Sequence, residues 1–558
     1  MAVRHYVLLA TDGFIDVPKD AEVCTTNRES IYAWGFIGGL LEVDGNIVKE
    51  NEYLDWRKPK NWKKLMDLRG TATIPSPIIW ADVGDRLYIT LINLGMKYRP
   101  DLPDFHTVHL HGAHVATQLD GFPETSWGVP MWMGADDGGK LEKPPAATYY
   151  FNPEHPGTLM YHCHIEASEH VQMGMYGALI IYPSVKSLKK AGITQHWDGR
   201  WFLGDRYLRN IPKTATHRNF AYNNIHTYFD EENIMLLSDI DSVWHSSVLK
   251  NQDFNAVNFK PDYWLVNGRA FPDTLLPHPL TPSMDSDPNL TQINYESYVH
   301  VKTNDKFLLR MINLGYQVVP WHIHGWHFTQ IGKDQHLSPF IAQAAKRIRL
   351  NNKFVTRGFT ATIGSGETYD LLLTADSKLP QYRNYIVNGQ DGFQSLCKQM
   401  RELQKIDSEA IFNIPTDPVK CPDPDTVNYV DICMQCQSCG DNDKFFPQFY
   451  PMHNHDDYKV TNNGVYPGGQ LTYIQTDAPS SCDHHEDFDV DEYDEEIYQD
   501  EYDENTQDYN VQIQQTQNEL SQISQKKIDI DIDELDTLLE DSIESVISDS
   551  FLKDLENL

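Results

Sequence analysis

Residues 84–95 read GDRLYITLINLG and residues 304–315 read NDKFLLRMINLG, so one pattern recurs after 220 positions. In both copies apolar residues alternate with polar ones and run into an Asn-Leu-Gly turn, which predicts a β-strand followed by a loop. A long internal repeat of this kind indicates two copies of one structural unit. Helical periodicity is scarce around both copies, and we therefore expect an all-β fold made of two β-sandwich domains.

A histidine-rich loop follows each copy of the repeat. The first is FHTVHLHGAH at 105–114 and the second is PWHIHGWH at 320–327; each half has one further His-X-His pair, in YHCH at 161–164 and in MHNH at 452–455. Alternate residues of a strand point to the same face, so each pair presents two imidazoles to one place. Imidazole binds copper, iron and zinc, and eight such histidines suit a cluster of about three metal ions.

A soft metal ligand stands inside the second pair of the first half. Cys163 lies between the two histidines of YHCH, so its side chain points to the opposite face of the strand. His170 and Met175 follow it, and His106 comes three residues before the first His-X-His pair. A cysteine, two histidines and a weak methionine are the ligand set of a blue-copper electron-transfer site. The sequence therefore predicts such a site beside the histidine cluster.

With these motifs the sequence resembles the multicopper oxidases of the two-domain, laccase-like type, over roughly residues 1–478. The family pattern is HxxHxH, then HCH followed by His and Met, with two further HxH pairs in the other domain. The resemblance implies two cupredoxin-like, Greek-key β-sandwich domains and four copper ions for each functional unit. It implies His106, Cys163, His170 and Met175 as the ligands of the type 1 copper.

The same resemblance distributes the eight paired histidines over the remaining coppers. His109 and His322 match the ligands of the type 2 copper. The ligands of the binuclear type 3 pair would be His111, His162, His164, His324, His453 and His455.

The second half keeps its histidine pairs but lacks the type 1 ligands. At the corresponding sequence positions it has Val319, Asn454, Thr461 and Tyr466. We therefore expect one type 1 site in each chain, in the first domain.

The implied activity is that of an oxidase. A donor would give up electrons one at a time through the exposed edge of His170, and four electrons would reduce dioxygen to water. The donor is either a phenolic or aromatic compound or a low-valent metal ion such as Fe(II), Mn(II) or Cu(I). Glu166 and Glu169 lie between Cys163 and His170, where carboxylates would favour a cationic donor.

Reduction of dioxygen consumes protons, so the cluster needs an acidic neighbour. Asp120 and Asp334 lie nine and ten residues beyond His111 and His324. The sequence leaves open which of the two carboxylates relays protons.

Two other functions stay open on the sequence alone: a two-domain copper nitrite reductase and a non-enzymatic copper-binding cupredoxin scaffold. The eight paired histidines favour the oxidase, because a nitrite reductase needs fewer and a scaffold would tolerate their loss. In two-domain relatives the facing domains come from neighbouring subunits, so we expect a homotrimer. The length of the connector between the domains also allows pairing within one chain.

The composition excludes several classes of protein. The chain of 558 residues is 40% hydrophobic, which excludes a wholly disordered protein. Its net charge of −34 argues against nucleic acid and anionic membranes as partners. No apolar run approaches the about 20 residues of a spanning helix. The N-terminus shows no signal peptide, so we expect a cytoplasmic protein or one exported to the surface by a non-classical route.

The repeat and the charge pattern divide the chain. We expect a first domain over 1–185, a connector over 186–234, a second domain over 235–480 and a tail over 481–558. Residues 483–558 hold 26 acidic and 3 basic residues, which predicts a disordered acidic tail with a short amphipathic helix near its end.

A cysteine-rich insertion is expected in the second domain, near 421–440. Cys433, Cys436 and Cys439 form the motif CMQCQSC, and Cys421 lies upstream. This spacing suits Zn(II) or Cu(I) bound by thiolates, and disulfide pairing among the four cysteines is an equal alternative.

Overall fold

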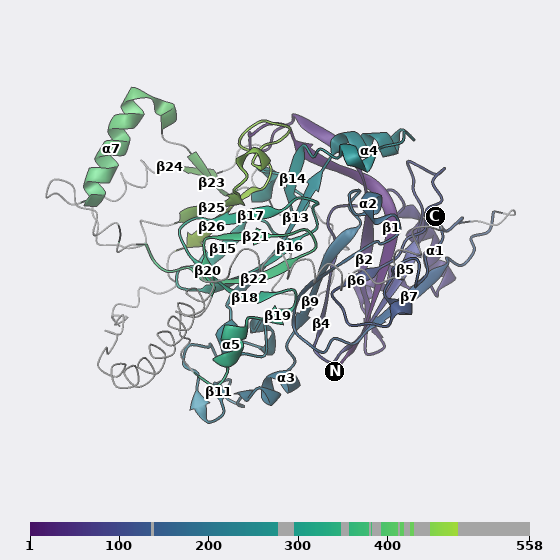
Figure 1. Cartoon of the computed structure of the whole chain (residues 1–558), viewed down its shortest axis with the longest axis horizontal. Coiled ribbons are helices and arrows are strands. Elements are labelled where there is room, and N and C mark those ends of the chain that lie inside the picture. The colour runs from purple at the N-terminus through teal and green to yellow at the C-terminus, as the bar shows by residue number, and fades with distance from the viewer. Residues whose placement is uncertain are drawn as a thin grey trace, which may run out of the picture. The chain divides into compact units, whose positions relative to one another are not determined.

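The repeated motif forms the same strand in two β-sandwiches (Figure 1). Its first copy is β5 (Arg86–Asn93) and its second copy is β16 (Lys306–Asn313). Each lies parallel to the first strand of its half, β5 beside β1 (Val3–Pro18) and β16 beside β13 (Glu231–Ile240). The all-β sandwich fold predicted from the sequence is confirmed.

The computed structural model describes residues 1–134, 139–276, 295–347, 356–378, 381, 392–410, 413–417, 425–428 and 447–477. Residues 1–480 form one unit and residues 481–558 another. The acidic tail with its expected helix, and the cysteines at 421, 433, 436 and 439, lie outside the described residues. Within the described ranges, no helix is long and apolar enough to cross a membrane.

Two sheets form the first sandwich and two form the second. The first sandwich consists of β3 (Asn46–Ile47), β2 (Arg28–Val43), β1, β5 and β7 (Ala146–Phe151), facing β4 (Ser76–Asp82), β9 (Tyr176–Tyr182), β8 (Gly157–His162) and β6 (His109–His111). In the second, one sheet consists of β14 (Tyr263–Val266), β13, β16, β22 (Thr368–Thr374), β18 (Phe328–Lys333) and β19 (His336–Leu337), with β20 (Arg357–Gly358) on β18. Its other sheet consists of β15 (Val299–Lys302), β26 (Leu471–Asp477), β25 (Gln448–Asn454), β17 (Val319–Ile323) and β21 (Thr360–Ile363).

Helices and short strands lie outside these sheets. The helices are α1 (Pro59–Asp67), α2 (Ala167–His170), α3 (Val185–Lys190), α4 (Ser242–Leu249), α5 (Pro339–Gln343) and α7 (Gly392–Ile406). The 3-10 turns are η1 (Lys49–Leu54), η2 (Thr117–Leu119), η3 (His217–Asn219), η4 (Ile225–Thr227), η5 (Ala256–Asn258), η6 (Asp273–Leu275), η7 (Ser408–Ala410) and η10 (Asp457–Lys459). The remaining strands are β10 (Ile193–Gln195), β11 (Trp201–Leu203), β12 (Arg206–Tyr207), β23 (Asn413–Asp417) and β24 (Asp425–Asn428).

The strands are apolar because most are covered on both faces. In β1, Tyr6 and Leu8 point into the core of the first sandwich, while Val7 and Leu9 join the apolar cluster beside η1 and α1. This is the two-residue alternation of a strand with both faces buried. A third cluster joins Trp80 of β4 to strands of the second sandwich. The two sandwiches therefore share a buried apolar interface.

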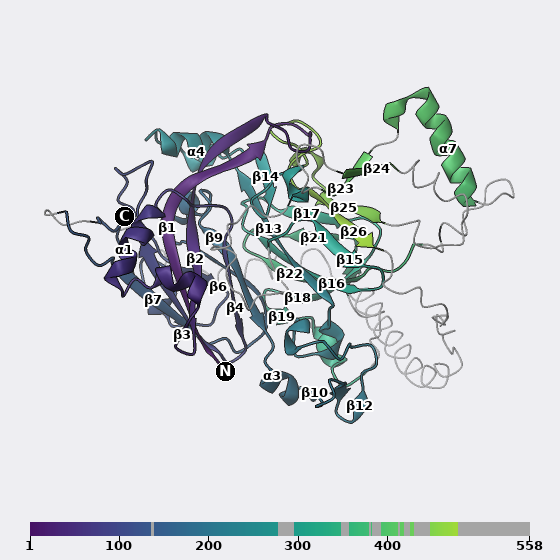
Figure 2. The ribbon, with the colours of Figure 1, turned by 180° about the vertical axis from the view of Figure 1, so that it is seen from behind.

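Each half also reaches over the other through the connection that follows its first strand. β1 and β2 form a long antiparallel hairpin, which arches toward β14 in Figures 1 and 2. Near its tip, Arg28 Nη1 lies 3.1 Å from Asp273 Oδ1, and the Tyr263 hydroxyl donates to Glu29 Oε2 at 2.9 Å. The first half thus holds the second with a pair of strands.

In the second half the matching connection, residues 241–262 between β13 and β14, contains a helix where the first half has a hairpin. This helix is α4, and the Asp241 carboxylate caps its N-terminus. α4 packs on the first sandwich, where His245 Nδ1 donates to the Tyr32 carbonyl at 2.6 Å. Each half therefore packs a segment on the other: the β1–β2 hairpin contacts the second sandwich, and α4 contacts the first.

The predicted connector is a small folded segment with its own apolar cluster. It comprises α3, the three-stranded sheet β10-β11-β12, and the turns η3 and η4. β13 already begins at Glu231, so the end of the predicted connector belongs to the second sandwich. The sequence showed no sign of a strand there because its first residues are charged. Glu232 can nevertheless be buried in the strand, since it forms an ion pair with Arg310 at 2.7 Å.

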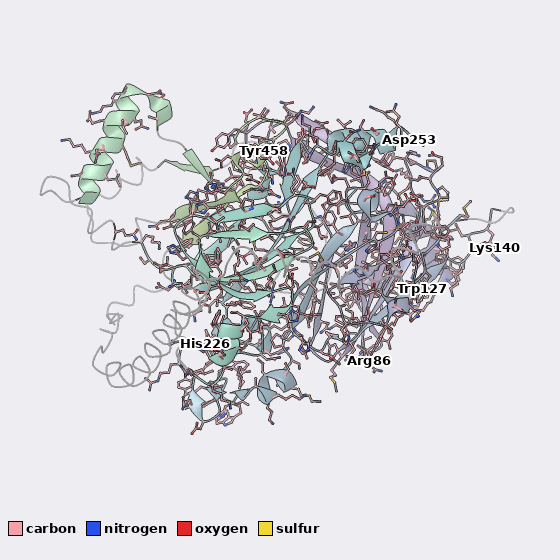
Figure 3. The ribbon with its side chains drawn as sticks, viewed as in Figure 1. Arg86, Trp127, Lys140, His226, Asp253 and Tyr458 are labelled. Carbon is pink, nitrogen blue, oxygen red and sulfur yellow. The ribbon has the colours of Figure 1, made fainter. Side chains whose placement is uncertain are left out.

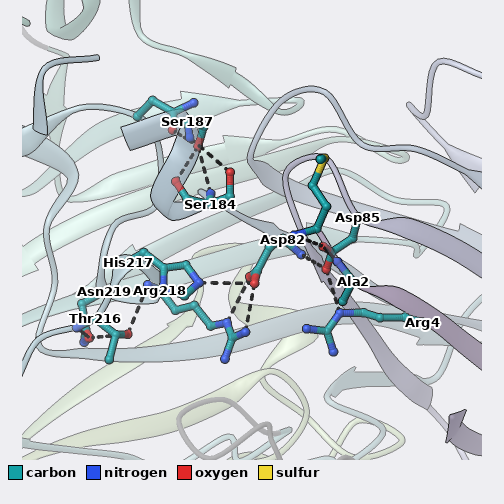
Figure 4. A network of polar contacts seen from close by, with 12 residues as sticks. Ala2, Arg4, Asp82, Asp85, Ser184, Ser187, Thr216, His217, Arg218 and Asn219 are labelled. Atoms are coloured by element: carbon teal, nitrogen blue, oxygen red, sulfur yellow. Dashed lines mark hydrogen bonds and ion pairs between the residues drawn. The ribbon is translucent and has the colours of Figure 1, made fainter. Parts of the chain in front are cut away.

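A carboxylate at the end of β4 holds this connector against the first sandwich (Figure 4). His217 Nε2 and Arg218 Nη2 lie 3.2 and 2.9 Å from Asp82 Oδ2. Burial alone would raise the pKa of Asp82, but the hydrogen bonds and positive charges of these two residues outweigh it and lower the pKa to about 2. The Arg218 guanidinium also lies 4.4 Å from the centre of the Trp80 ring, a cation–π contact that fixes the same junction.

Candidate metal centre

A closed loop between β8 and β9 brings the predicted type 1 ligands together. Cys163 directly follows β8, and its N–H donates to the Met175 carbonyl at 3.0 Å. The Met175 N–H in turn donates to the His170 carbonyl at 3.1 Å, at the end of α2. These backbone hydrogen bonds close the loop, so that Cys163, His170 and Met175 lie close to one another.

Three residues of this loop and His106, which precedes β6, gather in one buried region, which we call the cage (His106, Cys163, His170 and Met175). Cys163 Sγ lies 3.3 Å from His170 Nδ1 and 3.8 Å from His106 Nδ1, and the two Nδ1 atoms are 3.3 Å apart. All four residues are at most 1% exposed. Three donor atoms thus lie close together, and Met175 is buried in the same apolar core as Cys163.

The surroundings of the cage favour uncharged side chains. Burial raises the pKa of the Cys163 thiol to about 11 and lowers the pKa of His170 to about 3. The Thr107 N–H points at Cys163 Sγ at 3.4 Å, a contact that would stabilise a thiolate. A soft cation that displaces the thiol proton would therefore meet three unprotonated donors.

Four histidines of the first half gather on the other face of the same strands, and we call them the first quartet (His109, His111, His162 and His164). β6 pairs with β8 so that His109 lies opposite His162, and neighbouring rings have their centres 5.1 to 5.7 Å apart. His109 Nδ1 donates to the Asp120 carbonyl at 2.7 Å and His162 Nδ1 to the Cys163 carbonyl at 2.9 Å. Because a carbonyl only accepts, these bonds leave both Nε2 atoms unprotonated for a metal.

The second half builds a matching group, the second quartet (His322, His324, His453 and His455). β17 pairs with β25 so that His322 lies opposite His453, and neighbouring ring centres are 4.7 to 5.6 Å apart. His322 Nδ1 donates to the Phe359 carbonyl and His453 Nδ1 to the Asn454 carbonyl, both at 2.9 Å. Both quartets thus fix their ring orientation in the same way.

The two quartets belong to different sandwiches. Among the described residues, no ring contact joins a histidine of one quartet to a histidine of the other. A cavity of about 260 Å³ lies beside the first quartet and is lined by residues of both sandwiches, including His111, His162, Tyr316 and Gly366. A small molecule therefore has room next to the first quartet within one chain.

A comparison with known families agrees with this arrangement. Residues 49–185 match a family model described as multicopper oxidase. These residues belong to the multicopper oxidase family. The matched range contains the whole cage and the first quartet, and the family predicted from the sequence is confirmed.

The multicopper oxidase similarity extends to individual proteins. L-ascorbate oxidase of Cucurbita maxima is 28% identical over 168 residues, which are 29% of this chain and 25% of that protein, so the chain spans about a quarter of the length of this relative. The Blue Copper Oxidase from Nitrosomonas europaea is 19% identical, with a TM-score of 0.43 over 85% of both chains. Multicopper Oxidase mgLAC is 18% identical, with a TM-score of 0.44 over 87% of this chain and 89% of that chain.

Both predicted proton-relay carboxylates interact electrostatically with histidines of the first quartet. Asp120 Oδ1 lies 3.4 Å from His109 Nδ1. Asp334 belongs to the second sandwich, yet its negative charge opposes the fall in the pKa of His111 that burial causes. The expectation from sequence had placed Asp334 with His324, in its own half. The tertiary structure instead turns it toward the other half.

The donor side of the cage differs from the sequence expectation. His170 is fully buried, so the prediction that its edge is exposed is wrong. Trp34 lies edge-on to its ring at 5.0 Å, and Asp104 Oδ2 lies 3.8 Å from His170 Nε2. These neighbours cover the imidazole from two sides.

Asp104 is the functional candidate that sequence reasoning missed. Burial first, and then the charges of Glu166 and Glu169, raise its pKa to about 6. Glu166 is exposed and holds a left-handed backbone with φ of 39°. We call these three residues the donor carboxylates. Their signal in the sequence was weak, since Asp104 stands two residues before His106 in an ordinary loop.

Cys163 and Cys24 differ in their oxidation state. Cys163 is a free, buried thiol, as its predicted role requires. Cys24 is disulfide-bonded.

Proposed function

We propose that the chain is a copper-dependent oxidase in which four one-electron oxidations of a donor are coupled to the reduction of dioxygen to water. The observation that supports it most strongly is the presence of two oriented histidine quartets, one in each sandwich, together with a buried cysteine–histidine cage behind the first quartet. A nitrite reductase would use only part of this set. A scaffold would have no need of histidine rings whose N–H groups are fixed by carbonyls.

The residues fit copper. The three donor atoms of the cage lie within 4.8 Å of one another in a buried space, and sulfur with imidazole is a set that favours copper. The cage would hold a type 1 copper. The type 2 copper would be held by His109 and His322, and the type 3 pair by the other histidines of the quartets. Bound copper would supply one-electron transfer at the cage and dioxygen reduction at the quartets.

The chain itself provides the path between these centres. Cys163 is joined through single peptide bonds to His162 and His164, so the backbone links the cage to the first quartet. Asp120 and Asp334 would hold and deliver protons beside His109 and His111. The cavity of about 260 Å³ beside His111 would admit dioxygen without opening the cage.

The donor carboxylates favour a low-valent metal ion over a phenol. A phenol needs contact with the imidazole edge, and His170 is fully buried. Asp104, Glu166 and Glu169 instead offer oxygen ligands, which suit a hard cation such as Fe(II) or Mn(II). The donor would lose one electron through Asp104 and His170, and no proton need move.

The assembly is proposed to be a homotrimer. Each quartet lies on a different sandwich, and no described ring contact joins them within the chain. A cluster built from both would form where the first quartet of one subunit faces the second quartet of its neighbour, and three such contacts close a ring. A monomer in light scattering that keeps full copper and full activity would contradict this assembly.

Copper analysis together with an oxygen electrode tests the function. We expect about four coppers per chain and dioxygen uptake with Fe(II), Mn(II) or a phenol. A count of about two, with reduction of nitrite, would identify a nitrite reductase instead. Bound copper without dioxygen uptake from any of these donors would leave only a scaffold.

A further inference from the structure

The α4 segment, residues 241–262, lies over the donor side of the cage although it belongs to the second sandwich. Trp244 and Val248 of α4 are part of the apolar core of the first sandwich. Arg99 of the first sandwich donates to the Val248 carbonyl and, at 3.0 Å, to Asn251 Oδ1. Asp253, labelled in Figure 3, is an exposed residue of this segment. One half of the chain thus covers the electron entry site of the other.

Trp244 connects this segment to a donor carboxylate. Its indole Nε1–H donates to Glu169 Oε2 at 3.3 Å, and Trp244 itself is 2% exposed. Its ring stacks on Phe254, with centres 4.7 Å apart and planes 18° apart. Stacking on Phe254 therefore fixes the orientation of the indole, and its N–H fixes the position of the Glu169 carboxylate.

A second observation shows that the site faces a ligand. His170 Nε2 is buried and has no hydrogen-bond partner, and the nearest carboxylate oxygen, Asp104 Oδ2, is 3.8 Å away. A polar atom in this position is costly to bury unless something completes its surroundings. Because Nδ1 faces the cage, Nε2 carries the ring proton and is directed at the donor carboxylates, where an oxygen ligand of a bound cation would accept its hydrogen bond.

We propose that the α4 segment selects the electron donor, with Trp244 as the positioning residue that fixes Glu169 beside His170. The stacked pair Trp244 and Phe254 closes this side of the cage to flat organic donors and leaves the donor carboxylates for a small cation. This inference rests on the proposed oxidase function, whose donor it specifies. It assigns the choice of donor to a segment that the sequence places in the domain without a type 1 site.

The test measures the first half-reaction alone. The copper-loaded protein is mixed without oxygen with Fe(II) or with a bulky phenol, and the bleaching of its blue absorption is followed at several donor concentrations. In Trp244→Phe, which keeps the ring and loses the N–H, we expect the apparent Kd for Fe(II) to rise about tenfold. The limiting bleaching rate and the phenol kinetics should stay unchanged, because neither depends on Glu169.

Matched variants separate this role from a loss of structure. Trp264 also donates its indole N–H to a side chain, Gln317, at 3.0 Å, and Trp264→Phe should leave both donors unaffected. Arg28→Gln loosens the contact of the β1–β2 hairpin with the second sandwich and should do the same. Phe254→Ala should quicken bleaching by the phenol. Equal effects of Trp244→Phe on both donors, or none on either, would overturn the proposal.

A binding measurement keeps the result independent of electron transfer. Zn(II), which is redox-inert, is titrated by calorimetry into the copper-loaded full chain. Beyond any Zn(II) binding by the cysteine-rich motif, which all variants share, we expect one binding event that Glu169→Gln abolishes and Trp244→Phe weakens, with no change in Trp264→Phe. If these Zn(II) results hold while no donor bleaches the protein, the oxidase proposal fails and the cation site stands. If Zn(II) binds equally to all variants, the site itself is refuted.

Discussion

The cage of the first sandwich and its counterpart in the second share one backbone and differ in every functional side chain. The Cys163 N–H donates to the Met175 carbonyl, and the Asn454 N–H donates to the Gln470 carbonyl, both at 3.0 Å. In the counterpart, Asn454 Nδ2 also donates to Gln470 Oε1 at 2.8 Å. The side chains of the counterpart therefore satisfy one another, whereas those of the cage leave their donor atoms to a metal.

The counterpart also carries its own cation. Lys459, beside the Tyr458 labelled in Figure 3, is 2% exposed. Its ammonium donates to the Val318 carbonyl at 2.9 Å and lies 2.9 Å from Asp456 Oδ2. The neighbouring Val319 stands where the cage has His106.

Other features are common to both halves and serve the architecture. Asp12 of β1 accepts hydrogen bonds from the N–H groups of Lys97 and Tyr98, at 2.7 and 2.8 Å. Asp239 of β13 accepts them from Tyr316 and Gln317, at 3.1 and 3.0 Å. In each half a buried carboxylate thus holds the loop that leads to the histidines. The two halves thus keep the same loop supports and the same histidine pairs and differ in the residues at the type 1 positions.

The largest expected effect comes from removing the sulfur of the cage. Cys163→Ser should abolish the blue absorption near 600 nm, roughly, and lower the oxidase activity by at least about 10³-fold, because the hydroxyl is a poor copper ligand. The coppers of the quartets should remain bound. Absorption spectra, copper analysis and dioxygen uptake measure these outcomes. A variant that stays blue would disprove the role of Cys163.

The pH dependence of stability tests the role of Asp239, the buried carboxylate that supports the loop in the second half. Burial, only partly offset by the two backbone hydrogen bonds, raises the pKa of Asp239 from 3.8 to about 6. Because the folded pKa lies above the unfolded one, ionisation costs folding free energy, and stability is lost as the pH rises from about 4 to about 6. The loss is about 3 kcal/mol. Chemical denaturation of the wild type and of Asp239→Asn should show a difference that changes by this amount across the window, and a pH-independent difference would contradict it.

Replacing Lys459 should lower the stability of the protein without changing its copper content. In Lys459→Met the Val318 carbonyl loses a charged donor, and we expect the free energy of unfolding to fall by about 2 kcal/mol. The blue absorption should not change, because the cage lies in the other sandwich. Denaturation curves and a visible spectrum of the same sample provide the check. A loss of blue colour would mean that the two regions are coupled.

The smallest loss of stability is expected from Asn454→Ser, the substitution in the second sandwich that corresponds to Cys163→Ser in the first. Asn454→Ser removes the side-chain hydrogen bond to Gln470 and weakens the one that Asn454 Oδ1 accepts from the Asp456 N–H; it should cost about 1 kcal/mol, with no change in colour, copper content or dioxygen uptake. Thermal denaturation together with copper analysis measures it. A loss of copper as severe as in Cys163→Ser would show that the counterpart still takes part in metal binding.

Much of the candidate centre could be predicted because its ligands are close in sequence. The His-X-His pairs follow the two-residue period of a strand, and Cys163 inside such a pair must point to the opposite face. The structure places both quartets and the cage as this rule requires. Counting equal numbers of residues from the His-X-His pair had matched Met175 of the first half with Tyr466 of the second. In the structure the residue equivalent to Met175 is Gln470, because its carbonyl accepts from Asn454 as that of Met175 accepts from Cys163. Loop length differs between the halves, and sequence offsets do not record it.

The sequence by itself determined the all-β repeat, the family and the side chains that face one another, because these follow from local strand geometry and motif spacing. Only the tertiary structure decided that His170 is covered, that Asp104 and Asp334 act across loops and sandwiches, and that Trp244 from the second half reaches the first. Such contacts join residues that are far apart in the chain. They depend on how whole sheets pack and on where the connecting arms fall, and no local pattern of residues encodes either.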